Sequence, residues 1–249
     1  MPENEMPNEI KLKLFGPVAE SAGRTLQSVW DLVFGSFDTY VAKKRLDRAK
    51  NLEDFKQSLE NRVAEIPADA LKEPRLSVLG PTLEASKYYF EEDTLREMFA
   101  TLAAAAFDKR KERDMHPSYP EIIKQLSPLD AANLIIFTNQ LPLAEYYIGH
   151  ESKVYKTTVL SNVFISNRLE TDLELQSQSI SSLSRLGLIA VEYESRVLAD
   201  SFYAKFETTP YFYKLSESLQ NDGDQYAGVR RGRAYLTPLG KSFKRVCLG

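Results

Sequence analysis

The chain has 249 residues and a net charge of −3, from 32 lysine and arginine against 35 aspartate and glutamate side chains. With 43% hydrophobic and 27% charged residues, it has the composition of a soluble globular protein, which excludes collagen-like, disulfide-stapled and wholly disordered chains. The single cysteine, Cys247, can form neither an internal disulfide nor half of a zinc site. A reducing, cytoplasmic location is therefore expected.

The first ten residues lack the basic stretch and apolar run of a secretory signal. No segment reaches the roughly 18 to 20 consecutive apolar residues that a membrane-spanning helix needs. We therefore expect no transmembrane segment.

Apolar residues at three- and four-residue spacing predict a long helix from Pro17 to about residue 41, kinked at Gly35. A basic stretch follows its aromatic stripe. The segment could therefore lie on a membrane surface or contact a partner, or it could pack its stripe against another helix. The residues of this candidate contact are Trp30, Phe34, Phe37, Lys43, Lys44 and Arg45.

Further helices are predicted along the first 150 residues. One begins at the cap Asn51 and stops before Pro67. Another has an acidic start at residues 91–94 and ends at the basic stretch 109–113, as the helix dipole favours. Prolines suited to the first helical turn open two more helices, at Pro120 and Pro128.

The composition changes after about residue 150. Residues 154–165 are rich in β-branched side chains, and their secondary structure stays open. Thr171 or Asp172 caps a helix that ends at Gly187, and strand candidates follow at 188–193 and 233–236 before a last helix capped by Thr237. This order is typical of a winged helix. The predicted fold is mainly α, with a helical domain at 1–150 and a winged-helix-like α+β domain at 151–249.

Four stretches resemble one known family in order and spacing. They are residues 88–102 (YYFEEDTLREMFATL), 116–131 (HPSYPEIIKQLSPLDA), 183–189 (LSRLGLI) and 236–243 (LTPLGKSF). Together they are similar to the Abi-alpha (abortive infection alpha) family of bacterial proteins. The resemblance implies a mostly helical cytoplasmic protein of phage defence, and it carries no assigned active site.

The residues themselves indicate no chemistry. His116 lies downstream of the acidic residues 91–93, but a role at a helix junction explains it better than acid-base work or metal binding. Glycine-rich phosphate loops and the G-x-S-x-G elbow are missing from the sequence. We therefore expect no catalytic residue, no metal, no cofactor and no enzymatic activity.

The C-terminal segment suggests nucleic acid as a possible partner. Residues 225–249 hold six cations and no acidic side chain, which favours contact with phosphates. The preceding predicted helix offers Gln176 and Gln178 for base contacts but few cations. The candidate nucleic-acid-binding residues are Arg185, Arg230, Arg231, Arg233, Lys241 and Lys244.

The aromatic residues 203–213 could anchor a protein partner or belong to the core, and core is the favoured interpretation. The function expected from sequence is non-enzymatic phage defence through protein binding or self-association. Two other functions stay open: a DNA-binding regulator that uses the basic C-terminal segment, and a membrane-associating effector that uses the N-terminal helix.

Overall fold

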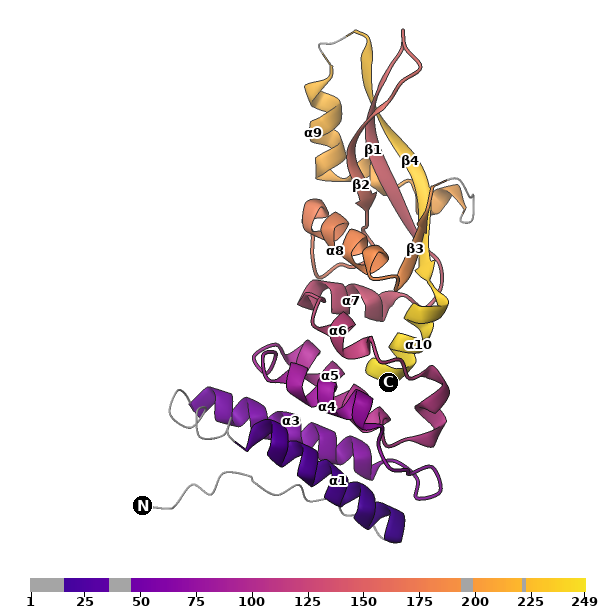
Figure 1. The fold of residues 1–249 in the computed structure, drawn as a ribbon. Coiled ribbons are helices and arrows are strands. Elements are labelled where there is room, and N and C mark those ends of the chain that lie inside the picture. Colours follow the sequence, from indigo (N-terminus) through magenta and orange to yellow (C-terminus); the bar gives the residue numbers. More distant parts are fainter. Residues whose placement is uncertain (1–15, 36–45, 194–198, 221–222) are drawn as a thin grey trace. The chain divides into compact units, whose positions relative to one another are not determined.

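The computed structural model describes residues 16–35, 46–193, 199–220 and 223–249 (Figure 1). Within these ranges, the residues of 1–128 and 242–249 form one compact unit, unit 1, and residues 129–241 form another, unit 2. Unit 1 contains α1 (Pro17–Phe34), α3 (Leu46–Ala64), α4 (Leu76–Ser86), α5 (Asp93–Ala105), the 3-10 helix η1 (Lys109–Asp114) and α6 (Tyr119–Ile123).

Unit 2 combines a sheet with helices. Its strands are β1 (Leu141–His150), β2 (Thr157–Val163), β3 (Ile189–Glu192) and β4 (Gln225–Leu236). Its helices are α7 (Pro128–Ile136), α8 (Leu173–Arg185), η2 (Asp200–Phe202), η3 (Phe206–Thr208) and α9 (Pro210–Ser218). The last helix, α10 (Pro238–Cys247), begins in unit 2 and ends in unit 1.

An aromatic cluster forms the core of unit 1. Trp30 of α1 lies with its ring centroid 4.4 Å from that of Phe34 and 6.0 Å from that of Phe55 on α3. Phe90 completes the cluster, 5.3 Å from Phe55 and 5.9 Å from Phe34. Because all four side chains are buried, the aromatic stripe of α1 packs against neighbouring helices.

Two helix boundaries in unit 1 differ from the prediction. Helix α3 runs from Leu46, so the predicted cap at Asn51 is wrong. The lysine, alanine and arginine before Asn51 are compatible with a helix. Helix α5 ends at Ala105, and the basic stretch forms η1 instead of the end of α5. The Asp108 side chain accepts a hydrogen bond from the Arg110 amide at 2.8 Å and thereby starts η1.

The sheet of unit 2 has four antiparallel strands in the order β2-β1-β4-β3. Strand β4 pairs with β1 over ten residues, from Leu141 opposite Ala234 to His150 opposite Gln225. Residues 141–150, expected within a helical domain, are therefore a strand. The open stretch 154–165 contains β2.

The predicted elements around β3 are confirmed. Asp172 caps α8 by accepting from the amides of Glu174 and Leu175, and Gly187 follows α8 with a φ of 72°, which favours glycine. Strands β3 and β4 pair from Ile189 opposite Leu236 to Glu192 opposite Arg233. The sheet is larger than a winged-helix hairpin, because β4 continues along β1.

Of the residues between β3 and β4, those of 199–220 cover one face of the sheet. Tyr203 and Phe206 are buried in a cluster with Ala144, Tyr146 and Val163, as the core interpretation predicted. The Tyr146 hydroxyl donates to the Phe206 carbonyl at 2.7 Å. Burial raises the pKa of Tyr146 to about 12, as expected for a phenol held in an apolar core.

Candidate binding surfaces

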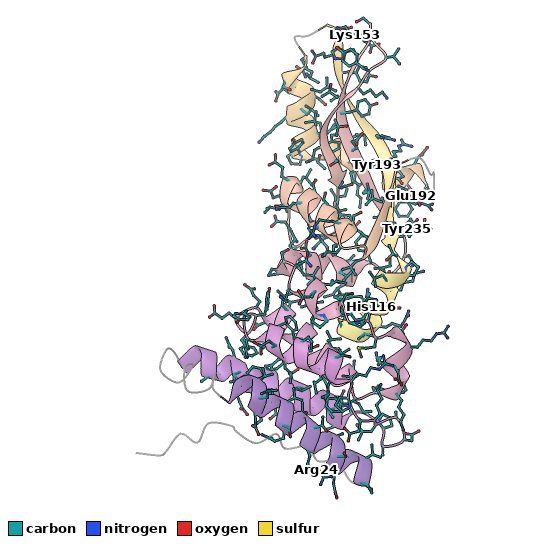
Figure 2. The ribbon with its side chains drawn as sticks, in the orientation of Figure 1. Arg24, His116, Lys153, Glu192, Tyr193 and Tyr235 are labelled. Carbon is teal, nitrogen blue, oxygen red and sulfur yellow. The ribbon has the colours of Figure 1, made fainter. Side chains whose placement is uncertain are left out.

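The three arginines of β4 lie on one strand but not on one face. Side chains alternate along a strand, so Arg230 points to the face opposite Arg231 and Arg233. Each arginine has a carboxylate partner: Arg230 lies 3.6 Å from Glu145, Arg231 pairs with Asp200, and Arg233 lies 2.6 Å from Glu192 (Figure 2 labels Glu192). Their charges are thus largely offset locally.

Each of these arginines also lies near a tyrosine ring. Arg230 stands 5.1 Å from the ring centroid of Tyr193, and Arg233 stands 5.3 Å from that of Tyr235. Tyr235 donates to the Glu192 carboxylate, which further occupies the partner of Arg233. These ring contacts hold the guanidinium groups against the sheet.

The other predicted nucleic-acid residues are distributed over the fold. Arg185, at the end of α8, and Lys241 are exposed in unit 2. Lys244 belongs to unit 1, where burial lowers its pKa. In α8, Gln176 is fully buried. It accepts a hydrogen bond from the Asn133 amide at 2.9 Å, so its side chain is not available to read a base.

Two partly exposed tyrosines lie on the Arg230 face of the sheet, Tyr147 half-buried and Tyr226 37% exposed. Tyr147 and Tyr226 lie across the glycines opposite them, Gly228 and Gly149, and a Cβ atom at either glycine would overlap the tyrosine ring. Lys156 lies 4.2 Å from the centroid of Tyr147 and donates to its hydroxyl at 3.1 Å. We call Tyr147, Lys156 and Tyr226 the tyrosine face.

The connection from β1 to β2 carries exposed apolar side chains. Val154 is 100% exposed and Tyr155 is 55% exposed. Lys153, labelled in Figure 2, donates to the Tyr155 hydroxyl at 3.3 Å, and the His150 ring lies 4.8 Å from that of Tyr155. We call Val154 and Tyr155 the hairpin tip.

Asp224 fastens the base of the hairpin tip. Its carboxylate accepts from the Ser152 amide at 2.8 Å and contacts His150 Nδ1 at 3.1 Å. The hydrogen bonds from Ser152, together with His150, lower the pKa of Asp224 to about 2. An ionised Asp224 therefore orders the start of the tip across the physiological pH range.

The described aromatic residues of the candidate membrane contact are buried and not exposed on the surface of α1. Trp30 is 2% exposed and Phe34 is fully buried, so membrane contact through them would require α1 to leave its neighbours. Phe37, Lys43, Lys44 and Arg45 lie outside the described residues. On α1 itself, the exposed large apolar side chains are those of Val18 and Leu32.

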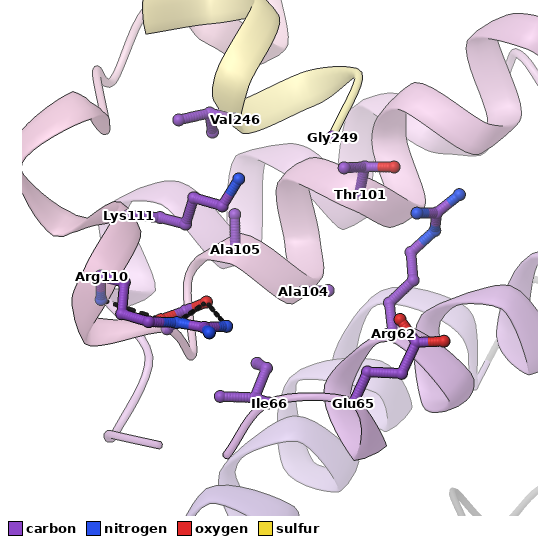
Figure 3. Close-up of a pocket in the computed structure, with 11 residues that line it drawn as sticks. Arg62, Glu65, Ile66, Thr101, Ala104, Ala105, Arg110, Lys111, Val246 and Gly249 are labelled. Atoms are coloured by element: carbon purple, nitrogen blue, oxygen red, sulfur yellow. Dashed lines mark hydrogen bonds and ion pairs between the residues drawn. The ribbon is translucent and has the colours of Figure 1, made fainter. Parts of the chain in front are cut away.

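A pocket of about 200 Å³ in unit 1 is lined by cations that already have partners (Figure 3). Arg62 pairs with Glu97 at 3.0 Å. Arg110 contacts both carboxylate oxygens of Asp108, and these hydrogen bonds lower the pKa of Asp108 although burial opposes its ionisation. The pocket therefore offers little free charge to a ligand.

His116 lies at a helix junction, as expected. Its Nδ1 contacts the Ser118 hydroxyl at 2.7 Å and accepts from the Ser118 amide at 3.2 Å, directly before α6. Among the described residues, no three His, Cys, Asp or Glu side chains are grouped to hold a metal ion. Across the same ranges, no helix combines the length and apolar character needed to cross a membrane.

The tyrosine face and the hairpin tip were not predicted from the sequence. Tyr147 and Tyr226 are 79 positions apart along the chain and meet only through the pairing of β1 with β4. One signal was present in β4, where Tyr226, Gly228, Arg230 and Gly232 alternate tyrosine or arginine with glycine at every second position. Such alternation is typical of aromatic rings covering glycines on a neighbouring strand.

Comparison with known proteins identifies one relationship. The family model described as Abortive infection alpha matches residues 47–247. No curated protein and no solved structure matches the chain. The matched range includes every described element except α1 and the first residue of α3.

Proposed function

The chain belongs to the abortive infection alpha family, and from this premise we propose that it defends bacteria against phage by binding a protein partner, without catalysing a reaction. The place of action that we propose is the bacterial cytoplasm. A buried single cysteine suits that reducing environment.

The observation that carries the proposal is the hairpin tip beside the tyrosine face. The exposed valine and tyrosine side chains stand next to each other at the hairpin tip and continue into Lys156 and Tyr147 of the tyrosine face, a combination of apolar, aromatic and polar groups that suits contact with a protein. Tyr147 and Tyr226 are held by the strands beneath them, so little side-chain entropy is lost on binding. Lys153 and Lys156 supply polar contacts at the rim.

A plaque assay tests the proposal. Expression of the protein in a phage-sensitive strain should reduce plaque formation, and the double substitution Val154→Ser, Tyr155→Ser should restore it. The matched control is Leu169→Ser, Tyr213→Ser, which removes an exposed leucine and an exposed tyrosine elsewhere in unit 2. Full plaque formation with the unaltered protein, or equal protection by both variants, would contradict the proposal.

Binding of duplex DNA is a second candidate, supported by the six cations of residues 225–249. Helix α8, strands β3 and β4 and helix α10 follow one another in the order of a winged helix, with η2, η3 and α9 inserted between the two strands. A salt-dependent gel shift that is lost on Arg230→Ala, Arg231→Ala and Arg233→Ala would select this function. We favour the protein partner because these three arginines are already paired with carboxylates.

Membrane association is a third candidate. The exposed Leu32 on α1, 83% accessible to solvent, is the position at which to test it, because its replacement leaves the aromatic core intact. Flotation of the protein with anionic liposomes that is lost on Leu32→Asp would select the membrane-associating effector.

A further inference from the structure

Unit 2 contains a pocket of about 460 Å³ that lies apart from the hairpin tip and the tyrosine face. It is formed by the loop between β2 and α8, by the first residue of α8 and by the N-terminal half of α9. Its volume lies in the range of about 300 to 1,000 Å³ that is common for small-molecule sites. The volume alone does not identify a ligand, so the kind of ligand is inferred from the residues that line the pocket.

The inner wall of the pocket is apolar and rigid. Phe164 is fully buried and stacks on Phe137, with centroids 5.6 Å apart and planes 9° from parallel. Tyr211 stacks on Tyr146 at 5.9 Å. Leu173, which packs against the core of unit 2, completes this wall. The wall therefore suits a flat or apolar group.

The two acidic side chains at the pocket are engaged with backbone amides. Glu170 accepts from the amides of Thr171 and Asp172 at 2.7 and 2.8 Å. Asp172 accepts from the amides of Glu174 and Leu175 at 2.8 and 3.3 Å. Asp172 thus caps the start of α8, and Glu170 binds the two amides just before it, so that one oxygen of each carboxylate is used within the chain.

The two basic side chains have no such partner. Arg168 and Lys214 are exposed at the pocket, and within the described ranges neither forms a side-chain hydrogen bond, an ion pair or a ring contact. This differs from the arginines of β4, each of which is held by a carboxylate. The pocket therefore combines an apolar wall with two cations that are free to meet an anion.

We propose that this pocket binds an amphipathic organic anion, a small molecule with an aromatic or aliphatic body and a single sulfonate, phosphate or carboxylate group. The body packs against Ile165, Leu173 and Tyr211, and the acidic group lies between Arg168 and Lys214. Desolvation of the body supplies most of the affinity, and the two cations select an anion over a neutral analogue.

The test uses two probes of nearly the same shape. 8-Anilinonaphthalene-1-sulfonate carries the acidic group and fluoresces when bound in an apolar site, whereas N-phenyl-1-naphthylamine has the same aromatic body without it. Titration of the full chain should give tighter binding of the sulfonate. Raising the salt concentration should weaken the binding of the sulfonate and leave the binding of the neutral probe unchanged.

Two double variants complete the test. The variant with Arg168→Gln and Lys214→Gln should bind the sulfonate about tenfold more weakly, as expected for the loss of two charge-assisted contacts at a partly exposed site. Its affinity for the neutral probe should be unchanged. The matched control, Lys205→Gln, Lys241→Gln, removes two exposed lysines of unit 2 that do not line the pocket, and should bind both probes as the unaltered protein does.

Three results would overturn the proposal. They are equal affinity for the two probes at low salt, an equal loss in both double variants, and the same salt dependence for the neutral probe as for the sulfonate. The salt comparison needs no substitution, so it decides the matter even if a variant proves unstable. Because the hairpin tip is unaltered in all these proteins, a negative result here leaves the proposed protein binding intact.

Discussion

Replacement of Trp30 by alanine distinguishes a core role for α1 from a surface role. Trp30 is 2% exposed and its ring meets those of Phe34 and Phe55. Truncation of a buried tryptophan to alanine costs about 3 to 5 kcal/mol, because apolar contacts are lost and a cavity is left. For a chain of this size, about 4 kcal/mol corresponds to a fall in melting temperature of about 8 to 16 °C.

The measurement is thermal unfolding followed by circular dichroism in the far ultraviolet. Trp30 is the only tryptophan of the chain, so fluorescence cannot be compared between the variant and the unaltered protein. Leu32→Ala is the matched control, since Leu32 is 83% exposed on the same helix and its truncation should change stability by at most about 0.5 kcal/mol. Equal melting temperatures for the two variants would refute the placement of Trp30 in a core.

Further predictions concern stability and reactivity. The Arg245 guanidinium holds the pKa of Asp114 at about 2, below its ordinary value. This ion pair should therefore stabilise the fold above pH 4 and lose its effect as the pH falls towards 2. In the variant Asp114→Asn, the melting temperature should change less with pH over that range. Gly228→Ala should lower the stability of unit 2, because the new methyl group would overlap the ring of Tyr147. Burial raises the pKa of Cys247 well above its ordinary value, so a thiol reagent should label it only after unfolding.

The sequence predicted those elements whose signals are local. Proline at the first turn marked α1 and α7, Asp172 and Gly187 marked the two ends of α8, and Thr237 marked the start of α10. Each signal acts within one helical turn of the residue that carries it. Boundaries without such a signal were missed, as at the start of α3, where Asn51 lies inside the helix.

The long strands and the candidate site depend on contacts between distant residues. Strand β1 reads as an ordinary mixed segment, and only its pairing with β4 makes it a strand and brings Tyr147 and Tyr226 onto one face. The stripe of Trp30 and Phe34 was recognised, but periodicity alone does not reveal what covers a stripe. The charges of Arg230 and Arg233 were counted correctly, whereas their partners Glu145 and Glu192 become neighbours only in the folded sheet.

The most direct test of the central claim, that the hairpin tip binds a protein, is photo-crosslinking inside infected cells. A benzoylphenylalanine residue replaces Tyr155 in one protein and Tyr213 in the other, both being exposed tyrosines of unit 2. After infection and irradiation, we expect a discrete protein adduct from position 155 and none from position 213. The absence of an adduct at position 155 from cells that are protected against the phage would contradict the claim.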